Sequence, residues 1–178
     1  TGACADLATA LCIAAEGVGA RARLIGAGAT LAATTGAGND CVGDDLDTHV
    51  ILMPPSQDID DCAAAAQVAD FFGNRTWWPG VTDGITDCWL VTVGGEFVAA
   101  DDAPPGAVHA AASAGFRSIG ADHPGVSFRH LDLPTELTVP ESAEALVAAL
   151  HTGDETELAF RHGGLYAKRI VAGDAAVA

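Results

Sequence analysis

The chain has a single tyrosine, Tyr166, and a single lysine, Lys168, and this pair is the first to test for chemistry. Short-chain reductases place a tyrosine and a lysine four positions apart on one helix face, where the ammonium lowers the pKa of the phenol and holds the cofactor ribose. Tyr166 and Lys168 are two positions apart in a predicted strand, and we expect their side chains on opposite faces of it. This arrangement cannot perform the reaction, and we predict no catalytic residue in the chain.

Two glycine-containing segments resemble dinucleotide-binding loops. Residues 17–22 (GVGARA) match the G-x-G-x-x-A pattern, but they lie between the end of a predicted helix and the start of a predicted strand. A pyrophosphate needs the opposite order, with the glycines between a strand and the N-terminus of a helix. Residues 26–31 (GAGATL) follow a predicted strand but carry leucine at the third small position. We therefore predict no cofactor-binding residue.

Metal-binding and nucleophile patterns are also missing from the sequence. Residues 44–47 (DDLD) lack the glycine and glutamate of a calcium loop, and no G-x-S-x-G is present. We interpret Asp101 and Asp102 as a turn and as the cap of the helix that follows them. The histidines occur without H-x-x-x-H or H-E-x-x-H spacing, so we predict no metal-binding residue among them: His49, His109, His123, His130, His151 and His162.

Composition limits the partners of the chain. The 178 residues carry a net charge of −16 with a pI near 4.3, and no basic stripe is present that could neutralise phosphates. We therefore expect no nucleic-acid partner and no anionic membrane surface. No apolar window reaches the ~18 residues of a transmembrane helix. The five cysteines are odd in number and form no C-x-x-C, which favours reduced thiols and a cytoplasmic protein.

Strands and helices alternate along the chain, which predicts a largely parallel sheet with right-handed crossovers. The central unit is a strand from Cys88, a helix that starts near Pro104-Pro105 and stops at Pro124-Gly125, and a second strand to Pro134. The run WLV in the first of these strands lacks strict alternation, as expected when both faces are covered. The other expected elements are helices over 1–17, 56–72 (capped by Ser56) and 141–150, and strands over 22–25, 49–53, 157–160 and 165–171.

Several short motifs occur in an order that resembles a known family. WLVT at 89–92 is followed by a helix that ends in G-x-x-S-x-x-x-x-H-P-G, and then by a strand that ends in DLP at 132–134. The end of the chain is similar to an R-x-G-x-x-Y-x-x-R hairpin. This order resembles the structural subdomain of ketoreductase regions in modular polyketide synthases, well over residues 46–171 and loosely over 1–45. The hairpin positions are held by Arg161, Gly163, Tyr166 and Arg169.

The resemblance implies a truncated Rossmann-like (short-chain dehydrogenase-like) three-layer α/β fold with a mostly parallel sheet and a C-terminal β-hairpin. Residues 1–171 would form the structural subdomain and 172–178 the start of a linker. Because the chain begins on a helix, its sheet would lack a first strand, and we expect the incomplete edge to be a docking surface. The domain would bind no cofactor itself.

The implied partners are domains of the same polypeptide. They are the catalytic ketoreductase half, which would bind NADPH, and neighbouring enoylreductase or dehydratase domains, in a synthase that is a homodimer and makes lipids. Trp77 and Trp78, in a predicted loop, suit either such an interface or a cover over their own sheet edge. Two other functions remain open: an incomplete NAD(P)-dependent reductase, and a stand-alone acidic binding module.

Overall fold

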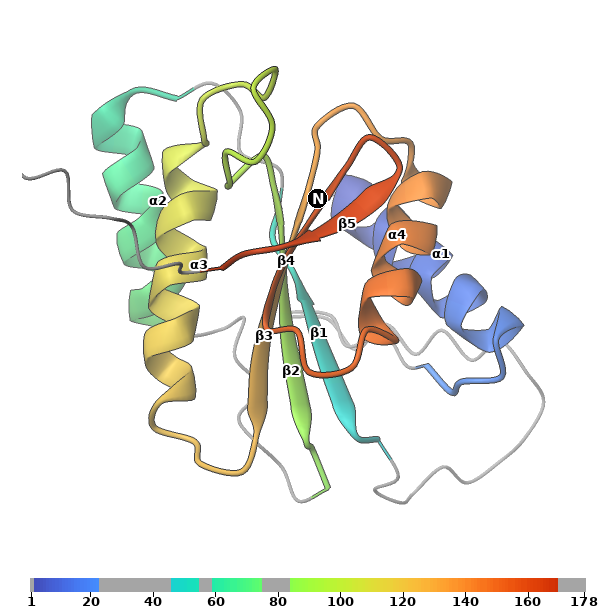
Figure 1. Cartoon of the computed structure of the whole chain (residues 1–178). Helices are drawn as coiled ribbons and strands as arrows, with labels where there is room; N and C mark the ends of the chain where they lie inside the picture. Colours follow the sequence, from blue (N-terminus) through green and yellow to red (C-terminus); the bar gives the residue numbers. More distant parts are fainter. Residues whose placement is uncertain (1, 23–45, 55–58, 75–83, 170–178) are drawn as a thin grey trace, which may run out of the picture.

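The computed structural model describes residues 2–22, 46–54, 59–74 and 84–169 (Figure 1). The predicted strand over 22–25, the segment 26–45 and the Trp77-Trp78 pair lie wholly or almost wholly outside these ranges. In chain order the elements are α1 (Gly2–Gly17), β1 (Thr48–Leu52), α2 (Asp61–Asn74), β2 (Asp87–Val93), α3 (Ala107–Gly120), β3 (Ser127–Leu133), α4 (Val139–Leu150), β4 (Glu157–Arg161) and β5 (Gly164–Ala167).

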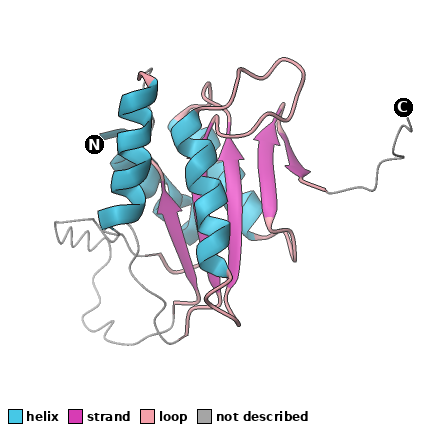
Figure 2. Cartoon of the chain, turned by 90° about the vertical axis from the view of Figure 1, so that its left-hand side faces the viewer, coloured by secondary structure: helices cyan, strands magenta, loops and turns pink. Residues whose placement is uncertain are grey.

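The five described strands form one sheet in the order β1-β2-β3-β4-β5. Neighbouring strands are parallel from β1 to β4, and β5 is antiparallel to β4. Helices α2 and α3 cover one face of the sheet, and α1 and α4 cover the other (Figures 1 and 2). This arrangement confirms the predicted three-layer α/β fold with a mostly parallel sheet and a C-terminal hairpin.

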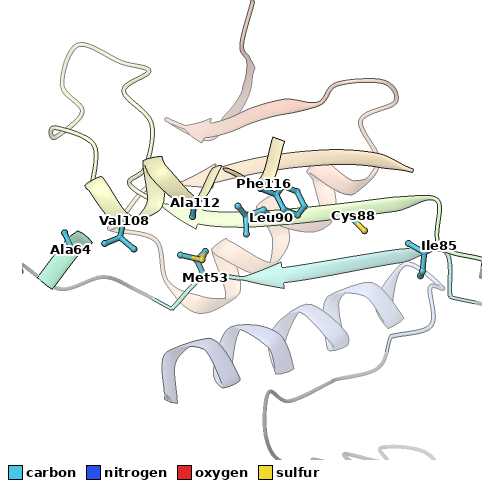
Figure 3. Close-up of a cluster of buried hydrophobic side chains, with 8 residues drawn as sticks. All are labelled: Met53, Ala64, Ile85, Cys88, Leu90, Val108, Ala112 and Phe116. Carbon is cyan, nitrogen blue, oxygen red and sulfur yellow. The ribbon is translucent and has the colours of Figure 1, made fainter. Parts of the chain in front are cut away.

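Each face of the sheet carries its own apolar core, and β2 contributes to both. Cys88 and Leu90 point toward α2 and α3, into the cluster drawn in Figure 3. Trp89 and Val91 point to the other face, toward α4. The four side chains are at most 1% exposed, which confirms that β2 is covered on both faces. Burial of this kind stabilises the fold by about 1.5–3 kcal/mol for each large apolar side chain.

The crossovers between parallel strands do not all have the same hand. The strand order advances in one direction from β1 to β4, yet α4 lies on the face opposite α2 and α3. The expectation of right-handed crossovers throughout is therefore wrong. The composition of β3 explains the change, because His130 and Asp132 face the α3 side while Leu131 and Leu133 face the other. Only the second side offers α4 an apolar surface, to which Leu158 of β4 also contributes.

Two helices begin later than the sequence suggested. Helix α2 was expected to start with Ser56 as its cap, but it begins at Asp61, and the carboxylate of Asp60 accepts the amide of Ala63 (2.9 Å) as an N-cap would. Helix α3 begins at Ala107, after rather than at the two prolines 104–105. Gly106 is its N-cap, because its carbonyl accepts the first helical hydrogen bond from Ala110.

Helix α4 and the hairpin show how local sequence sets the ends of elements. Helix α4 begins two residues before the predicted Glu141, because Thr138 and Glu141 form a capping box that satisfies the first helical amides. The β4–β5 hairpin turns through His162 and Gly163, which have φ values of 50° and 76°. Positive φ at both central residues is the signature of a type I′ turn. Strand β5 ends at Ala167, earlier than the predicted Val171.

Candidate functional site at the carboxyl ends of the strands

A buried carboxylate, Asp132, lies at the end of β3, where parallel α/β sheets usually bind ligands. Its Oδ1 accepts the hydroxyl of Thr92 (2.5 Å) and the amide of Gly95 (2.7 Å). Its Oδ2 accepts the amide of Glu96 (3.2 Å) and a guanidinium N–H of Arg161 (2.7 Å). Four donors thus compensate the buried carboxylate for its loss of hydration.

The guanidinium of Arg161 joins the hairpin to this carboxylate and is only 3% exposed. Its Nε donates to both oxygens of Asp102 (3.0 Å each), and its Nη2 donates to Asp132 and to the carbonyl of Glu96 (3.0 Å). Its Nη1 donates to the carbonyls of Asp132 (3.2 Å) and Phe160 (2.8 Å). Burial alone would lower the pKa of Arg161, but the two carboxylates outweigh burial and raise it.

Asp102 holds the loop that follows β2 and does not cap α3. Its Oδ2 accepts the amides of Val98 (2.8 Å) and Ala99 (3.2 Å), which closes a turn. The Val98 amide, the Ala99 amide and Arg161 lower the pKa of Asp102, with the Val98 amide contributing most. The turn predicted for this residue is confirmed, whereas the predicted helix cap is wrong, since the first turn of α3 follows Gly106 instead.

Two histidines complete the buried polar cluster. Nδ1 of His109 accepts the amide of Val93 (2.9 Å), so the ring of His109 donates from Nε2 to the carbonyl of Pro54 (3.1 Å). Burial lowers the pKa of His109 and favours this neutral ring. His130, on β3, pairs through Nε2 with the hydroxyl of Thr92 (2.8 Å). Neither histidine was assigned a role from the sequence, although the alternation of His130 and Asp132 with two leucines along β3 is a usable signal for His130.

A cavity of about 540 Å³ opens above this cluster, between the ends of β2 and β3 and the start of α3. Among the described residues its basic side chains are Arg161, which is already paired with two carboxylates, and His162, which lies 3.1 Å from Asp101. The cavity occupies the usual ligand position of an α/β sheet, but its lining is strongly acidic. Its carboxylates are those of Asp61, Glu96, Asp101, Asp102 and Glu136.

A comparison with known families now identifies the fold. Residues 6–170 match the family described as the polyketide synthase extender module SpnB, Rossmann fold domain. The chain belongs to this family. The match confirms the polyketide-synthase resemblance drawn from the motifs, and it extends over most of the N-terminal part that resembled the family only loosely. No curated protein matches the chain.

In this Rossmann domain Tyr166 lies in β5 of the hairpin and Lys168 follows that strand, and neither residue lines the acidic cavity. Both line a second cavity, of about 190 Å³, so the expectation that they point to opposite faces is wrong. The physical reason is the period of two in a strand, which puts residues i and i+2 on one face. Tyr166 is 46% exposed, and the ammonium of Lys168 lies 2.8 Å from a carboxylate oxygen of Glu96. The helical Tyr-x-x-x-Lys arrangement of a reductase is absent from the sequence.

One group of side chains in the described part of the Rossmann domain has the atoms and spacing to hold a metal ion. It consists of Glu96, His130 and Glu157, which come from the loop after β2, from β3 and from β4. Sequence reasoning missed the group because its members are 27 to 61 positions apart and match no ligand-spacing motif. Pairing of His130 with Glu157 in the register of β3 and β4 brings two of them together.

Proposed function

We propose that this Rossmann domain is a non-catalytic scaffold of a polyketide synthase. In this proposal it packs against the catalytic ketoreductase half of the same polypeptide and positions the neighbouring enoylreductase or dehydratase domain. The observation that carries the proposal is the acidic lining of the cavity at the carboxyl ends of β2 and β3. Parallel α/β sheets bind ligands at the carboxyl ends of their strands, and an acidic lining there disfavours the phosphates of a dinucleotide.

Electrostatics supports a scaffold over a cofactor-binding enzyme. Two like unit charges about 4 Å apart repel by ~1 kcal/mol in water and by ~4 kcal/mol near a protein surface. A pyrophosphate in the acidic cavity would meet several such charges, while Arg161 is already held by Asp102 and Asp132. At the start of α3 the amide of Gly106 donates to the carbonyl of Gly94 (2.8 Å), so this donor does not point to a phosphate.

The docking surface in this proposal is the sheet edge formed by β1. Within the described residues β1 pairs with β2 alone, and a partner strand or helix could cover its other side. NADPH would bind to the catalytic domains, and the parent synthase would be a cytoplasmic homodimer that elongates and reduces polyketide or fatty acyl chains.

The test uses the ketoreductase region of the parent synthase with and without this domain. The isolated domain is titrated with NADPH while the fluorescence of Trp77, Trp78 and Trp89 is followed, with the catalytic half as the positive control. We expect no saturable change with this domain up to millimolar NADPH. We also expect the domain to co-elute with the catalytic half in size-exclusion chromatography.

Two results would overturn the scaffold proposal. Saturable binding of NADPH at micromolar concentration would favour the incomplete reductase. A stable, monomeric domain that fails to associate with the catalytic half, and whose removal leaves ketoreductase activity unchanged, would favour the stand-alone acidic module.

A further inference from the structure

The smaller cavity lies on the α3 side of the sheet, beside the β4–β5 hairpin. None of the described helices covers the hairpin on this side, which faces the viewer in Figure 2. Among the residues that line the cavity are Glu96, His130 and Glu157. One ligand atom from each of these three residues lies within 4.8 Å of the other two. The imidazole of His130 is 1% exposed, whereas the two carboxylates are partly accessible.

The hydrogen bonds of Thr92 determine which nitrogen of His130 carries a proton. The hydroxyl of Thr92 has one proton and donates it to Asp132, a carboxylate that also accepts from Arg161. Toward His130 the hydroxyl oxygen can therefore only accept, so Nε2 of His130 must be the donor in their 2.8 Å contact. In a neutral imidazole with hydrogen on Nε2, Nδ1 carries a lone pair.

That lone pair is directed at other acceptors. Within the described ranges Nδ1 of His130 is buried and makes no hydrogen bond, and an oxygen of Glu157 lies 3.5 Å away. The same carboxylate of Glu157 forms an ion pair with Arg117 (2.8 Å). A bare nitrogen thus faces this carboxylate, with the carboxylate of Glu96 close to both. Three electron-pair donors around one point favour a bound cation.

We propose that Nδ1 of His130 and the carboxylates of Glu96 and Glu157 bind a divalent transition-metal ion of the zinc class. One imidazole and two carboxylates form a donor set that suits zinc, whereas magnesium prefers oxygen ligands alone. The cavity leaves an open side for a water molecule or an external ligand. The Thr92–Asp132 pair behind His130 acts as the outer shell that holds the ring and its tautomer.

Two exposed cations now neutralise the carboxylates and would compete with the metal. Arg117 lies 2.8 Å from Glu157, and Lys168 lies 2.8 Å from Glu96. Their side chains are 43% and 52% exposed, so each can turn into solvent at the cost of an ion pair worth about 1 kcal/mol or less. With zinc–ligand distances of about 2.0–2.2 Å, tetrahedral ligand atoms lie about 3.3–3.6 Å apart. The Glu157 oxygen, 3.5 Å from Nδ1 of His130, already meets this spacing, and ligand atoms as far as 4.8 Å apart would have to close by roughly 1 Å.

Calorimetric titration of the chain with Zn²⁺, and with Mg²⁺ for comparison, tests the proposal. We expect saturable binding of one Zn²⁺ and at least about a tenfold weakening in Glu96→Gln, since even outer-shell changes cost 10–100-fold. Lys168→Met should bind Zn²⁺ more tightly, because a competing cation is removed. The matched control is Asp101→Asn, which alters the exposed His162–Asp101 pair and should leave the affinity unchanged.

Two spectroscopic measurements locate the ion. In ¹H–¹⁵N spectra of the histidine rings, addition of Zn²⁺ should shift the ¹⁵N resonance of Nδ1 of His130, while Nε2 stays protonated. The Co²⁺-loaded chain should show no thiolate charge-transfer band. The proposal is overturned if Zn²⁺ does not bind, if Glu96→Gln binds Zn²⁺ as tightly as the original chain, or if the Co²⁺-loaded chain shows a thiolate band. It is also overturned if Nδ1 of His130 carries a proton and its ¹⁵N resonance does not change when Zn²⁺ is added. The last result would mean that a proton, and not a metal, joins the three groups.

Discussion

Replacement of Arg161 by methionine removes a buried cation while keeping most of the volume of its side chain. The change leaves Asp132, which is 0% exposed, without its counter-charge and leaves the carbonyls of Asp132 and Phe160 without their guanidinium donor. Removal of one partner from a buried ion pair costs about 3–5 kcal/mol, because the remaining charge stays desolvated. Three donors to Asp132 persist, so we expect a loss at the lower end, about 3 kcal/mol.

Equilibrium unfolding in urea, followed through the buried Trp89, measures this loss. With a urea m-value of about 2 kcal/mol/M, a loss of 3 kcal/mol moves the midpoint down by roughly 1.5 M. The matched control is Arg117→Met, which breaks the partly exposed ion pair with Glu157 and should cost about 1 kcal/mol or less. An Arg161→Met variant that loses no more stability than Arg117→Met would refute the reasoning, since Arg161 would then contribute no more than a surface arginine.

Three further outcomes follow from the same contacts. The pKa of Asp102 is lowered in the folded chain. The stabilising effect of this carboxylate is therefore complete above the unfolded pKa of about 4 and disappears as the pH falls through the folded pKa. Urea midpoints at pH 7 and pH 3 should differ less in Asp102→Asn than in the original chain. Gly95→Ala should destabilise the fold by about 1–3 kcal/mol, because the new Cβ would lie 2.9 Å from Cβ of His109. Gly73→Ala, in open space on α2, should instead stabilise the fold by about 0.5–1 kcal/mol in the same unfolding assay. Burial raises the pKa of the Cys88 thiol to about 11, so a thiol reagent at pH 8 followed by mass spectrometry should label exposed Cys62 and leave Cys88 unlabelled until the chain unfolds.

Local patterns determined the elements of this protein. The apolar run at 89–91 predicted a strand buried on both faces, whereas the helix stop predicted at Pro124-Gly125 was too late, since α3 ends at Gly120. The segment around His162 and Gly163 was predicted as the turn of a hairpin, and the motif order predicted a polyketide-synthase relative. The confirmed features depend on residues that are neighbours in the chain, so the sequence alone was sufficient for them.

The tertiary structure alone decided how the polar residues are used and on which face α4 lies. Thr92, Asp132 and Arg161 come from three strands, 29 to 69 positions apart, and only the parallel register places them at one end of the sheet. Each looked like an isolated polar residue in the sequence, because periodicity reports which face a residue occupies and not which charge it meets. The polar face of β3 in turn leaves the opposite face to α4, which is the reason that the crossovers differ in hand.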